Sequence, residues 1–337
     1  MKENKNACFS FSRKIKDDNK IMRPFWIIVN KEISDQIKSW RFIIMVGIIL
    51  LTCFGSLYTA LSNIGEAVSK VKDAGDPFLF LKLFTVSDGT MPSFFVFISF
   101  LGPLLGISLG FDAINSEFNK GTMSRILSQP IHRDNLINAK FMASLIVISV
   151  LFFVLGFLVM GIGLIAIGIP PTAEEFMRII SFLLLSIFYV AFWLNLSILF
   201  SVCCRQAATS ALSGVAVWLF FSIFFDMIIK IIARAMAPNP GFMHRAQLYG
   251  EQNFIMHLMR LSPTHLFSDG TTTLLMPSVR SLGPLTMEQV SGAIPSPLPL
   301  GQSILLVWPQ VTCLIAATVI CFALSYLLFM RKEVRAR

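Results

Sequence analysis

Charged residues are scarce in this sequence of 337 residues: Asp, Glu, Lys and Arg together make up 14%, whereas 55% of the residues are hydrophobic. A water-soluble domain usually carries about 25% charged residues. The hydrophobic residues also fall in continuous blocks that are long enough to cross a bilayer. The composition therefore excludes a soluble enzyme and predicts an all-α integral membrane protein.

The sequence also lacks the motifs of several catalytic classes. It has no Gly-rich phosphate loop ending in Gly-Lys-Ser/Thr, so we do not expect it to hydrolyse ATP by itself. Its four histidines form no His-Glu-x-x-His unit, and its six cysteines lack the paired spacing of a metal site. We expect no catalytic residue, no metal and no cofactor on this chain.

Two clusters resemble sites and have simpler explanations. Met256, His257, Met259 and His265 offer thioether and imidazole ligands that suit copper, but packing residues of an interfacial helix are the favoured interpretation. The segment 174–178 resembles the Glu-Glu-x-x-x-Arg motif of intramembrane proteases, but its Arg comes one residue early. Two acids at a helix amino terminus are explained by the helix dipole.

Six apolar blocks are long enough to span the membrane. They cover residues 42–61, 93–114, 141–169, 177–202, 207–229 and 303–330. If the amino terminus is inside, 19 of the 28 Lys and Arg residues lie on the cytoplasmic side. We therefore expect a multi-pass protein of the plasma membrane with both termini and residues 113–140 in the cytoplasm, and residues 62–92 and 230–302 outside.

The net charge of +9 concentrates at the ends of the apolar blocks, where anionic lipid headgroups lie, so the expected partner is lipid and not nucleic acid. We divide the chain into a cytoplasmic tail with an interfacial helix, residues 1–41, and a six-span membrane domain, residues 42–337. The outer segment 230–302 contains an apolar stretch over residues 254–267 that is too short to span the membrane. This stretch predicts a re-entrant or interfacial hairpin that is broken at Pro263 and precedes the last span.

The interfacial helix is predicted over residues 24–41 from a three-four spacing of apolar residues. This stripe consists of Trp26, Val29, Ile33, Ile37 and Trp40, and Lys31, Glu32, Asp35 and Lys38 lie away from it. The helix either anchors the chain at the headgroups or relays motion.

Few polar residues lie inside the predicted spans. Asp226 and Lys230 are four residues apart and are expected to pair on one helix face. We expect hydrogen bonds between helices from Asn195, Ser186, Ser197 and Ser201.

The cytoplasmic segment 113–140 predicts a short amphipathic helix at the membrane surface. Met123, Ile126 and Leu127 form an apolar patch, Gly121 permits a sharp turn before it, and Pro130 ends it. Such a helix can insert into a groove of another protein. A solvated connecting loop is the alternative.

This segment resembles the coupling helix of ABC exporter permeases of the ABC-2 (type V) class, in particular the branch that includes permeases linked to multicopper-enzyme maturation and gliding motility. The residues that carry the resemblance are Glu117, Gly121, Thr122, Leu127, Pro130, Arg133 and Lys140. The six-span layout, Lys31-Glu32 and the segment 261–263 also match. The long segment 230–302 departs from the compact members of the class.

The resemblance implies that Met123, Ile126 and Leu127 dock into a separate ATP-binding subunit, which holds ATP and Mg²⁺, while Glu117 and Arg133 fix the helix. It implies a second permease subunit, identical or paralogous, and a lipid-like or amphipathic cargo moved by ATP-driven closure. The alternative function is a membrane scaffold or assembly factor that binds a cytoplasmic partner without transport.

Overall fold

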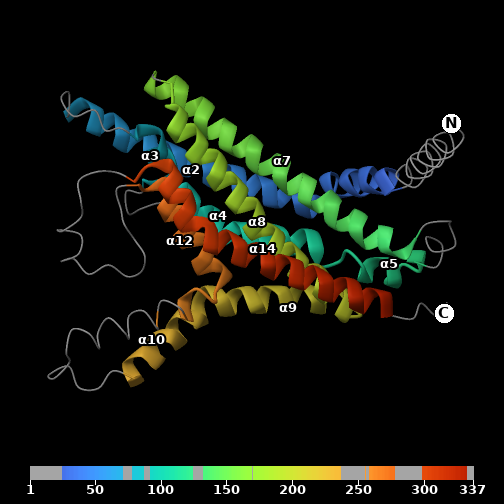
Figure 1. The fold of residues 1–337 in the computed structure, drawn as a ribbon. Coiled ribbons are helices and arrows are strands. Elements are labelled where there is room, and N and C mark those ends of the chain that lie inside the picture. Colours follow the sequence, from blue (N-terminus) through green and yellow to red (C-terminus); the bar gives the residue numbers. More distant parts are fainter. Residues whose placement is uncertain are drawn as a thin grey trace, which may run out of the picture.

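The computed structural model is helical and has no β-strand in the residues that it describes (Figure 1). These are residues 25–70, 78–86, 92–123, 132–168, 170–236, 255, 258–277 and 298–331. Six helical segments in this part of the chain are long and apolar enough to cross a membrane: Trp40–Ser62, Phe94–Asn119, Arg133–Ile167, Ala173–Cys203, Ala207–Ile232 and Leu300–Arg331. The predicted all-α architecture with six spans is therefore confirmed.

A helix over residues 25–37 precedes the first span. The elements that follow are α2 (Trp40–Lys70), α3 (Leu79–Thr85), α4 (Phe94–Gly110), α5 (Asn115–Asn119), α7 (Arg133–Ile167), α8 (Ala173–Cys203), α9 (Ala207–Leu219), the π-helix η1 (Phe220–Phe224), α10 (Phe225–Met236), α12 (Pro263–Leu275) and α14 (Leu300–Arg331). The third span begins before its apolar block, because residues 133–140 continue the same helix. Arg133 and Lys140, at the two ends of this stretch, both have partners within the protein.

Helix α8 lies at the centre of the bundle, in contact with α4, α7, α12 and α14. The most apolar stretch of its span is 72% buried, compared with 11% for the span formed by α9, η1 and α10. Glycines bring α4 close to α8: a Cβ atom at Gly106 would lie 2.8 Å from the Val190 carbonyl oxygen, and one at Gly110 would lie 2.8 Å from that of Leu194. Small residues at such a crossing let two membrane helices approach closely.

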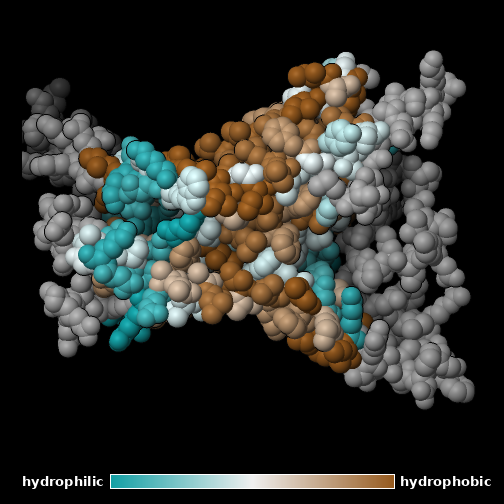
Figure 2. All heavy atoms as spheres, turned by 180° about the vertical axis from the view of Figure 1, so that it is seen from behind, coloured by the Kyte–Doolittle hydropathy of each residue, from teal (hydrophilic) through white to brown (hydrophobic). Residues whose placement is uncertain are grey.

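The bundle has two distinct ends. We call the end with helix 25–37, α5, the start of α7 and the end of α14 the α5 end, and the end with α3, the start of α8 and the start of α14 the α3 end (Figure 1). Figure 2 shows a broad hydrophobic band around the middle of one face, with hydrophilic residues gathered at the α5 end. Exposed apolar side chains such as Leu51, Ile165 and Leu305 suit contact with lipid tails.

The predicted apolar stripe of helix 25–37 divides between two faces. Val29 is fully buried and packs in a small cluster with Ala139 and Ala143 of α7. Trp26 and Trp40 are instead exposed. Glu32, which lies away from this stripe, is buried as well as Val29. Helix 25–37 therefore presents a mixed face to the protein and leaves Trp26 outward.

Helix α12 begins at the predicted break, after a turn at residues 260–262. Pro263 occupies the first position of the new helix, where its missing N–H costs nothing. Helix α12 packs between the spans: the Phe267 ring stacks on Tyr189 of α8 at 4.3 Å, and a Cβ at Gly270 would lie 2.8 Å from Leu185. Residues 254, 256 and 257 of the predicted hairpin lie outside the described part of the chain.

Candidate coupling site at the α5 end

The side chain of Lys140 joins three elements at the α5 end. It lies in the second turn of α7 and is 4% exposed. Its Nζ is 2.9 Å from Oε2 of Glu32, on helix 25–37, and 3.4 Å from Oε1 of Glu117, on α5. A buried ammonium group is tolerated only when it is paired. We call Glu32, Glu117 and Lys140 the coupling triad.

The triad extends into the segment that follows α5. The Thr122 hydroxyl donates to the Glu117 carboxylate. Gly121, between them, has a φ of +67°, a left-handed conformation that glycine adopts without the penalty of a side chain. The chain therefore turns back sharply after α5, as the sequence predicts for Gly121.

Met123 lies on the inner side of this turn. Its side chain is 2% exposed and belongs to the main hydrophobic core of the bundle. The outward docking role expected of Met123 is thus corrected: because Gly121 and Thr122 fold the chain back, Met123 packs on its own protein. The other predicted docking residues, Ile126 and Leu127, and the terminating Pro130, lie outside the described residues.

Lys31 adds a further positive charge beside the triad, at the protein surface. Its Nζ lies 3.4 Å from both Glu32 Oε1 and Asp35 Oδ2. Partial burial acts to lower the pKa of Lys31, but the nearby carboxylates of Glu32, Glu117 and Asp35 outweigh it, and the pKa is raised. Lys31 therefore stays protonated and adds a second cation beside two acids.

Helix α8 holds the start of α5. The Ser201 hydroxyl accepts hydrogen bonds from the backbone N–H groups of Ile114 (2.9 Å) and Asn115 (3.2 Å), and the Asn119 side chain donates to the Arg205 carbonyl oxygen (3.1 Å). The interhelical role predicted for Ser201 is confirmed. Because these bonds satisfy backbone N–H groups that the amino end of α5 leaves unpaired, they fix the direction in which α5 leaves α4.

The first span is tied to the same region. The Arg41 guanidinium, at the start of α2, lies 2.6 Å from the Asp112 carboxylate and stacks over the Phe111 ring at 4.8 Å. Phe111 and Asp112 form the connection between α4 and α5. A displacement of α5 would therefore be transmitted to α2 as well as to α7.

Arg133 makes a contact that the sequence did not indicate. Its guanidinium donates to the Phe329 carbonyl oxygen at 2.7 Å and lies 4.8 Å from the centre of the Phe329 ring. Arg133 therefore ties the start of α7 to the end of α14. The structure brings Glu117, Thr122 and Lys140 together but places Arg133 against the last span.

The contact of Glu32 with Lys140 was not predicted, although Lys31-Glu32 is part of the resemblance. A signal for it exists: Lys140 lies at the start of an apolar block, where a lysine without an acid is costly. Helix 25–37 also forms a second polar contact with α7, in which the Gln36 amide donates to the Ser144 hydroxyl at 2.7 Å. Spacing along the sequence cannot show which acid reaches across to α7.

The other polar residues predicted within spans have mixed outcomes. Ser197 donates to the Ile107 carbonyl oxygen of α4 at 3.1 Å, which confirms its interhelical role. Ser186 instead donates within its own helix, to Phe182, because the serine hydroxyl reaches the carbonyl one turn back. Asn195 is fully buried, and neither atom of its amide has a hydrogen-bond partner among the described residues.

Asp226 pairs with a residue other than the predicted Lys230. Its carboxylate bonds to His265 Nε2 on α12. Tertiary packing prevails here because α12 lies beside the π-helical turn that precedes Asp226. The sparsely packed fifth span is therefore linked to the core through a polar contact.

Glu174, Glu175 and Arg178 have structural roles. Thr172 and Glu175 form a reciprocal capping box at the start of α8, which agrees with the helix-terminus explanation. Arg178 is fully buried and donates to Glu174 (2.8 Å), the Leu274 carbonyl oxygen and the Ser303 hydroxyl (both 3.1 Å). Arg178 thus joins α8, α12 and α14 at the α3 end.

Residues 256–265 include the Met and His side chains that suit copper. Among the described residues, no group of three or more His, Cys, Asp and Glu side chains is placed to hold a metal ion. Met256 and His257 lie outside that part of the chain.

Comparison with known proteins identifies the family. Residues 26–334 match the family of ABC-2 family transporter proteins. The chain is 25% identical over 217 residues to the probable ABC transporter permease protein NosY of Pseudomonas aeruginosa. The aligned residues cover 63% of this chain and 71% of that protein. It is 23% identical over 214 residues to the protein of the same name from Stutzerimonas stutzeri, with 62% and 70% covered. The match extends over nearly the whole chain, so this protein belongs to the ABC-2 transporter family and is a multi-pass membrane permease subunit of an ABC transporter.

Proposed function

We propose that the chain is the permease of an ATP-driven exporter and that a separate nucleotide-binding subunit docks on the segment between Met123 and His132. The observation that carries this proposal is the coupling triad: a buried ion-pair network lies at the base of the segment and joins α5, α7 and helix 25–37. The partner subunit supplies the ATP and Mg²⁺ sites.

Both ends of the docking segment are anchored. At the first end Glu117 holds Thr122, and at the second end Arg133 holds α14 through Phe329. A force on the segment is therefore passed to α7 and α14 rather than absorbed by a free loop. In this proposal Ile126 and Leu127 contact the partner, Pro130 ends the short helix, and Met123 secures it to the bundle.

Helix α7 is suited to carry the motion across the membrane. It has 35 residues, which corresponds to about 52 Å at 1.5 Å per residue. This length exceeds the roughly 30 Å of a bilayer core, so the helix reaches from the docking segment to the opposite surface. A tilt imposed at Lys140 then displaces the far end of α7.

A second permease subunit, either identical or paralogous, completes the proposed transporter. The fifth span is only 11% buried and the span of α14 only 17%, so both leave long apolar faces uncovered. Two such subunits would enclose a path along apolar walls, which suits a lipid-like or amphipathic cargo. The distribution of Lys and Arg favours the plasma membrane with the α5 end in the cytoplasm.

Co-purification with the nucleotide-binding subunit followed by an ATPase assay in lipid nanodiscs tests this function. The exporter proposal expects ATP hydrolysis by the complex to differ from that of the isolated partner and to respond to variants of the triad. A partner that binds the chain but hydrolyses ATP identically with and without it favours the scaffold alternative.

A further inference from the structure

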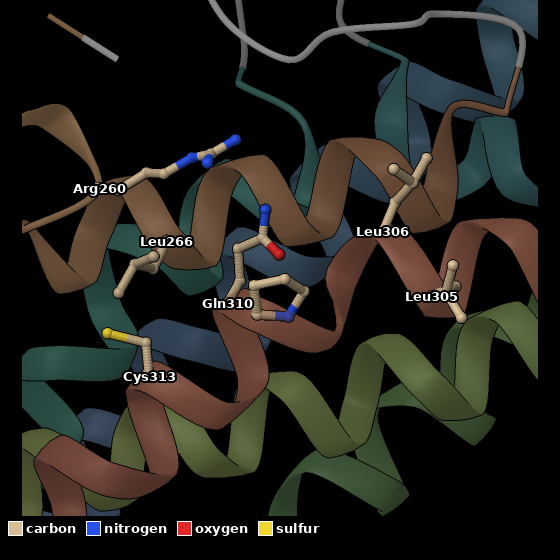
Figure 3. A pocket seen from close by; sticks show the side chains of 7 residues that line it. Arg260, Leu266, Leu305, Leu306, Gln310 and Cys313 are labelled. Atoms are coloured by element: carbon tan, nitrogen blue, oxygen red, sulfur yellow. The ribbon is translucent and has the colours of Figure 1, made fainter. Parts of the chain in front are cut away.

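A pocket opens between the turn before α12 and the first half of α14. Its volume is about 310 Å³, at the small end of ligand pockets in general. Figure 3 shows Arg260 and Leu266 on the α12 side and Leu305, Gln310 and Cys313 on the α14 side. The walls are thus largely apolar, with one cationic group.

The pocket lies at the surface of the bundle, some distance along α14 from the α3 end. Leu274 and Ser303 meet at the α3 end through Arg178, whereas Leu266 and Arg260 share the pocket with Gln310 and Cys313, so α12 runs antiparallel to α14. Gln310 and Cys313 come ten to thirteen residues after Leu300, about 15–20 Å along the helix axis. Arg260 therefore lies well inside the end of the bundle.

The guanidinium of Arg260 lacks a counter-charge in contact. Within the described residues it makes no ion pair, and its Nε is buried without a hydrogen-bond partner. Asp269 is close enough for the Arg260 charge to act on it, but not within ion-pair distance. A guanidinium at membrane depth is costly without an anion, and it offers five donors in a fork that matches carboxylate or phosphate.

The other polar groups nearby already have partners. In the orientation that satisfies the neighbouring hydrogen-bonding groups, the Gln310 amide donates to the carbonyl oxygens of Leu306 (2.8 Å) and Val307 (3.1 Å) in its own helix. His265 bonds to Asp226. Gln310 and His265 carry no negative charge, and the Asp226 carboxylate is already bonded to His265, so none of them neutralises Arg260.

We propose that this pocket binds an amphiphile with an anionic head and a single alkyl chain, in which Arg260 pairs with the carboxylate or phosphate and the chain lies along Leu266, Leu305, Pro309 and Cys313. The volume admits a head group and part of one chain, but not a whole lipid with two chains. Leu305 is 76% exposed, so the pocket is open to the face that lipid covers. The identification of this ligand as the cargo rests on the proposed permease function, whereas its binding to the pocket does not.

Equilibrium binding to the purified chain in nanodiscs of zwitterionic lipid tests the pocket. The probes are oleate, 1-oleoyl-lysophosphatidate and the uncharged monoolein, at a pH at which both acids are ionised. We expect either acid to bind at least about tenfold more tightly than monoolein, the difference made by one charge-assisted hydrogen bond. The relative affinities of oleate and lysophosphatidate show whether carboxylate or phosphate is preferred.

Arg260→Gln should abolish the preference for the acids, and Arg260→Lys should retain part of it. Leu266→Trp, which fills the apolar wall without changing the charge, should weaken binding of all three probes. The matched control is Arg205→Gln, which removes a guanidinium at the α5 end and should leave binding unchanged. Thermal stability of each variant shows that it is folded.

Equal binding of oleate and monoolein by the wild type overturns the proposal. So does a preference that survives Arg260→Gln, or oleate binding that is unaffected by Leu266→Trp. Recovery of the nucleotide-binding subunit is measured on the same preparations, and its absence contradicts the proposed function without altering the result for the pocket.

Discussion

The ammonium group of Lys140 lies 2.9 Å from the carboxylate of Glu32, although Lys140 is on α7 and Glu32 is on the helix that precedes the first span. Both side chains are almost fully buried, and Glu117 completes the group from α5. The contact makes helix 25–37 part of the bundle rather than an independent membrane anchor. It also places the base of the proposed docking segment in direct contact with two other elements.

Replacing Lys140 should destabilise the protein and uncouple ATP hydrolysis. Lys140→Gln leaves the Glu117 carboxylate without a cation in contact and Glu32 with only the exposed Lys31, and removal of one partner of a buried pair costs about 3–5 kcal/mol. Thermal unfolding in nanodiscs and ATPase stimulation are the measurements. Lys31→Gln is the control, because this lysine is 57% exposed and its ion pairs are worth about 1 kcal/mol or less. If both variants behave alike, the triad does not hold the α5 end together.

Gly121→Ala should weaken the turn that leads into the docking segment. A side chain at a φ of +67° costs about 1–2 kcal/mol, and since no atom lies within 4 Å of the new Cβ, the cost is conformational rather than steric. Gly161→Ala is the matched control, because Gly161 lies within α7 with open space around it, and alanine favours a helix. Partner affinity should fall for Gly121→Ala only. An unchanged affinity would show that the turn does not position the segment.

Gly110→Ala should force α4 away from α8. The new Cβ would lie 2.8 Å from the Leu194 carbonyl oxygen, and since backbone cannot rotate out of the way, we expect a loss of about 1–3 kcal/mol in stability. Gly47→Ala, with nothing within 4 Å, is the control. Thermal unfolding of the two variants in the same lipid provides the comparison, and equal stability would contradict close packing of α4 on α8.

Asp226 and His265 should be energetically coupled. Each single alanine substitution removes the bond between α10 and α12, so the double variant should lose less stability than the sum of the two singles. A coupling of about 0.5–1.5 kcal/mol is expected for one hydrogen bond at a half-buried site. A double-mutant cycle of unfolding free energies measures it. Additive losses would mean that the contact contributes nothing, and Lys230→Ala serves as the reference for the pair that the sequence predicted.

The spans could be predicted from the sequence because bilayer thickness alone sets their length, and all six were found. The contacts between them could not. The acid that reaches Lys140, the pairing of Asp226 with His265 and the inward turn of Met123 all depend on how helices distant in sequence pack. Pro263 was ambiguous for a local reason, since proline both ends one helix and begins another. Part of the candidate site was nonetheless predicted, because Glu117, Gly121 and Thr122 are near neighbours along the chain.

Recovery of the nucleotide-binding subunit by the Leu127→Glu variant tests the docking segment most directly. If Leu127 inserts into an apolar groove of the partner, a carboxylate there is buried unpaired at a cost of several kcal/mol, and the partner should dissociate. Ser124→Glu, at a polar position outside the apolar patch of the predicted helix, adds the same charge and should change binding little, since surface substitutions usually stay within about 0.5 kcal/mol. At matched membrane expression, we expect the wild type and Ser124→Glu to recover the partner and Leu127→Glu to lose it; equal recovery by all three would contradict the coupling assignment.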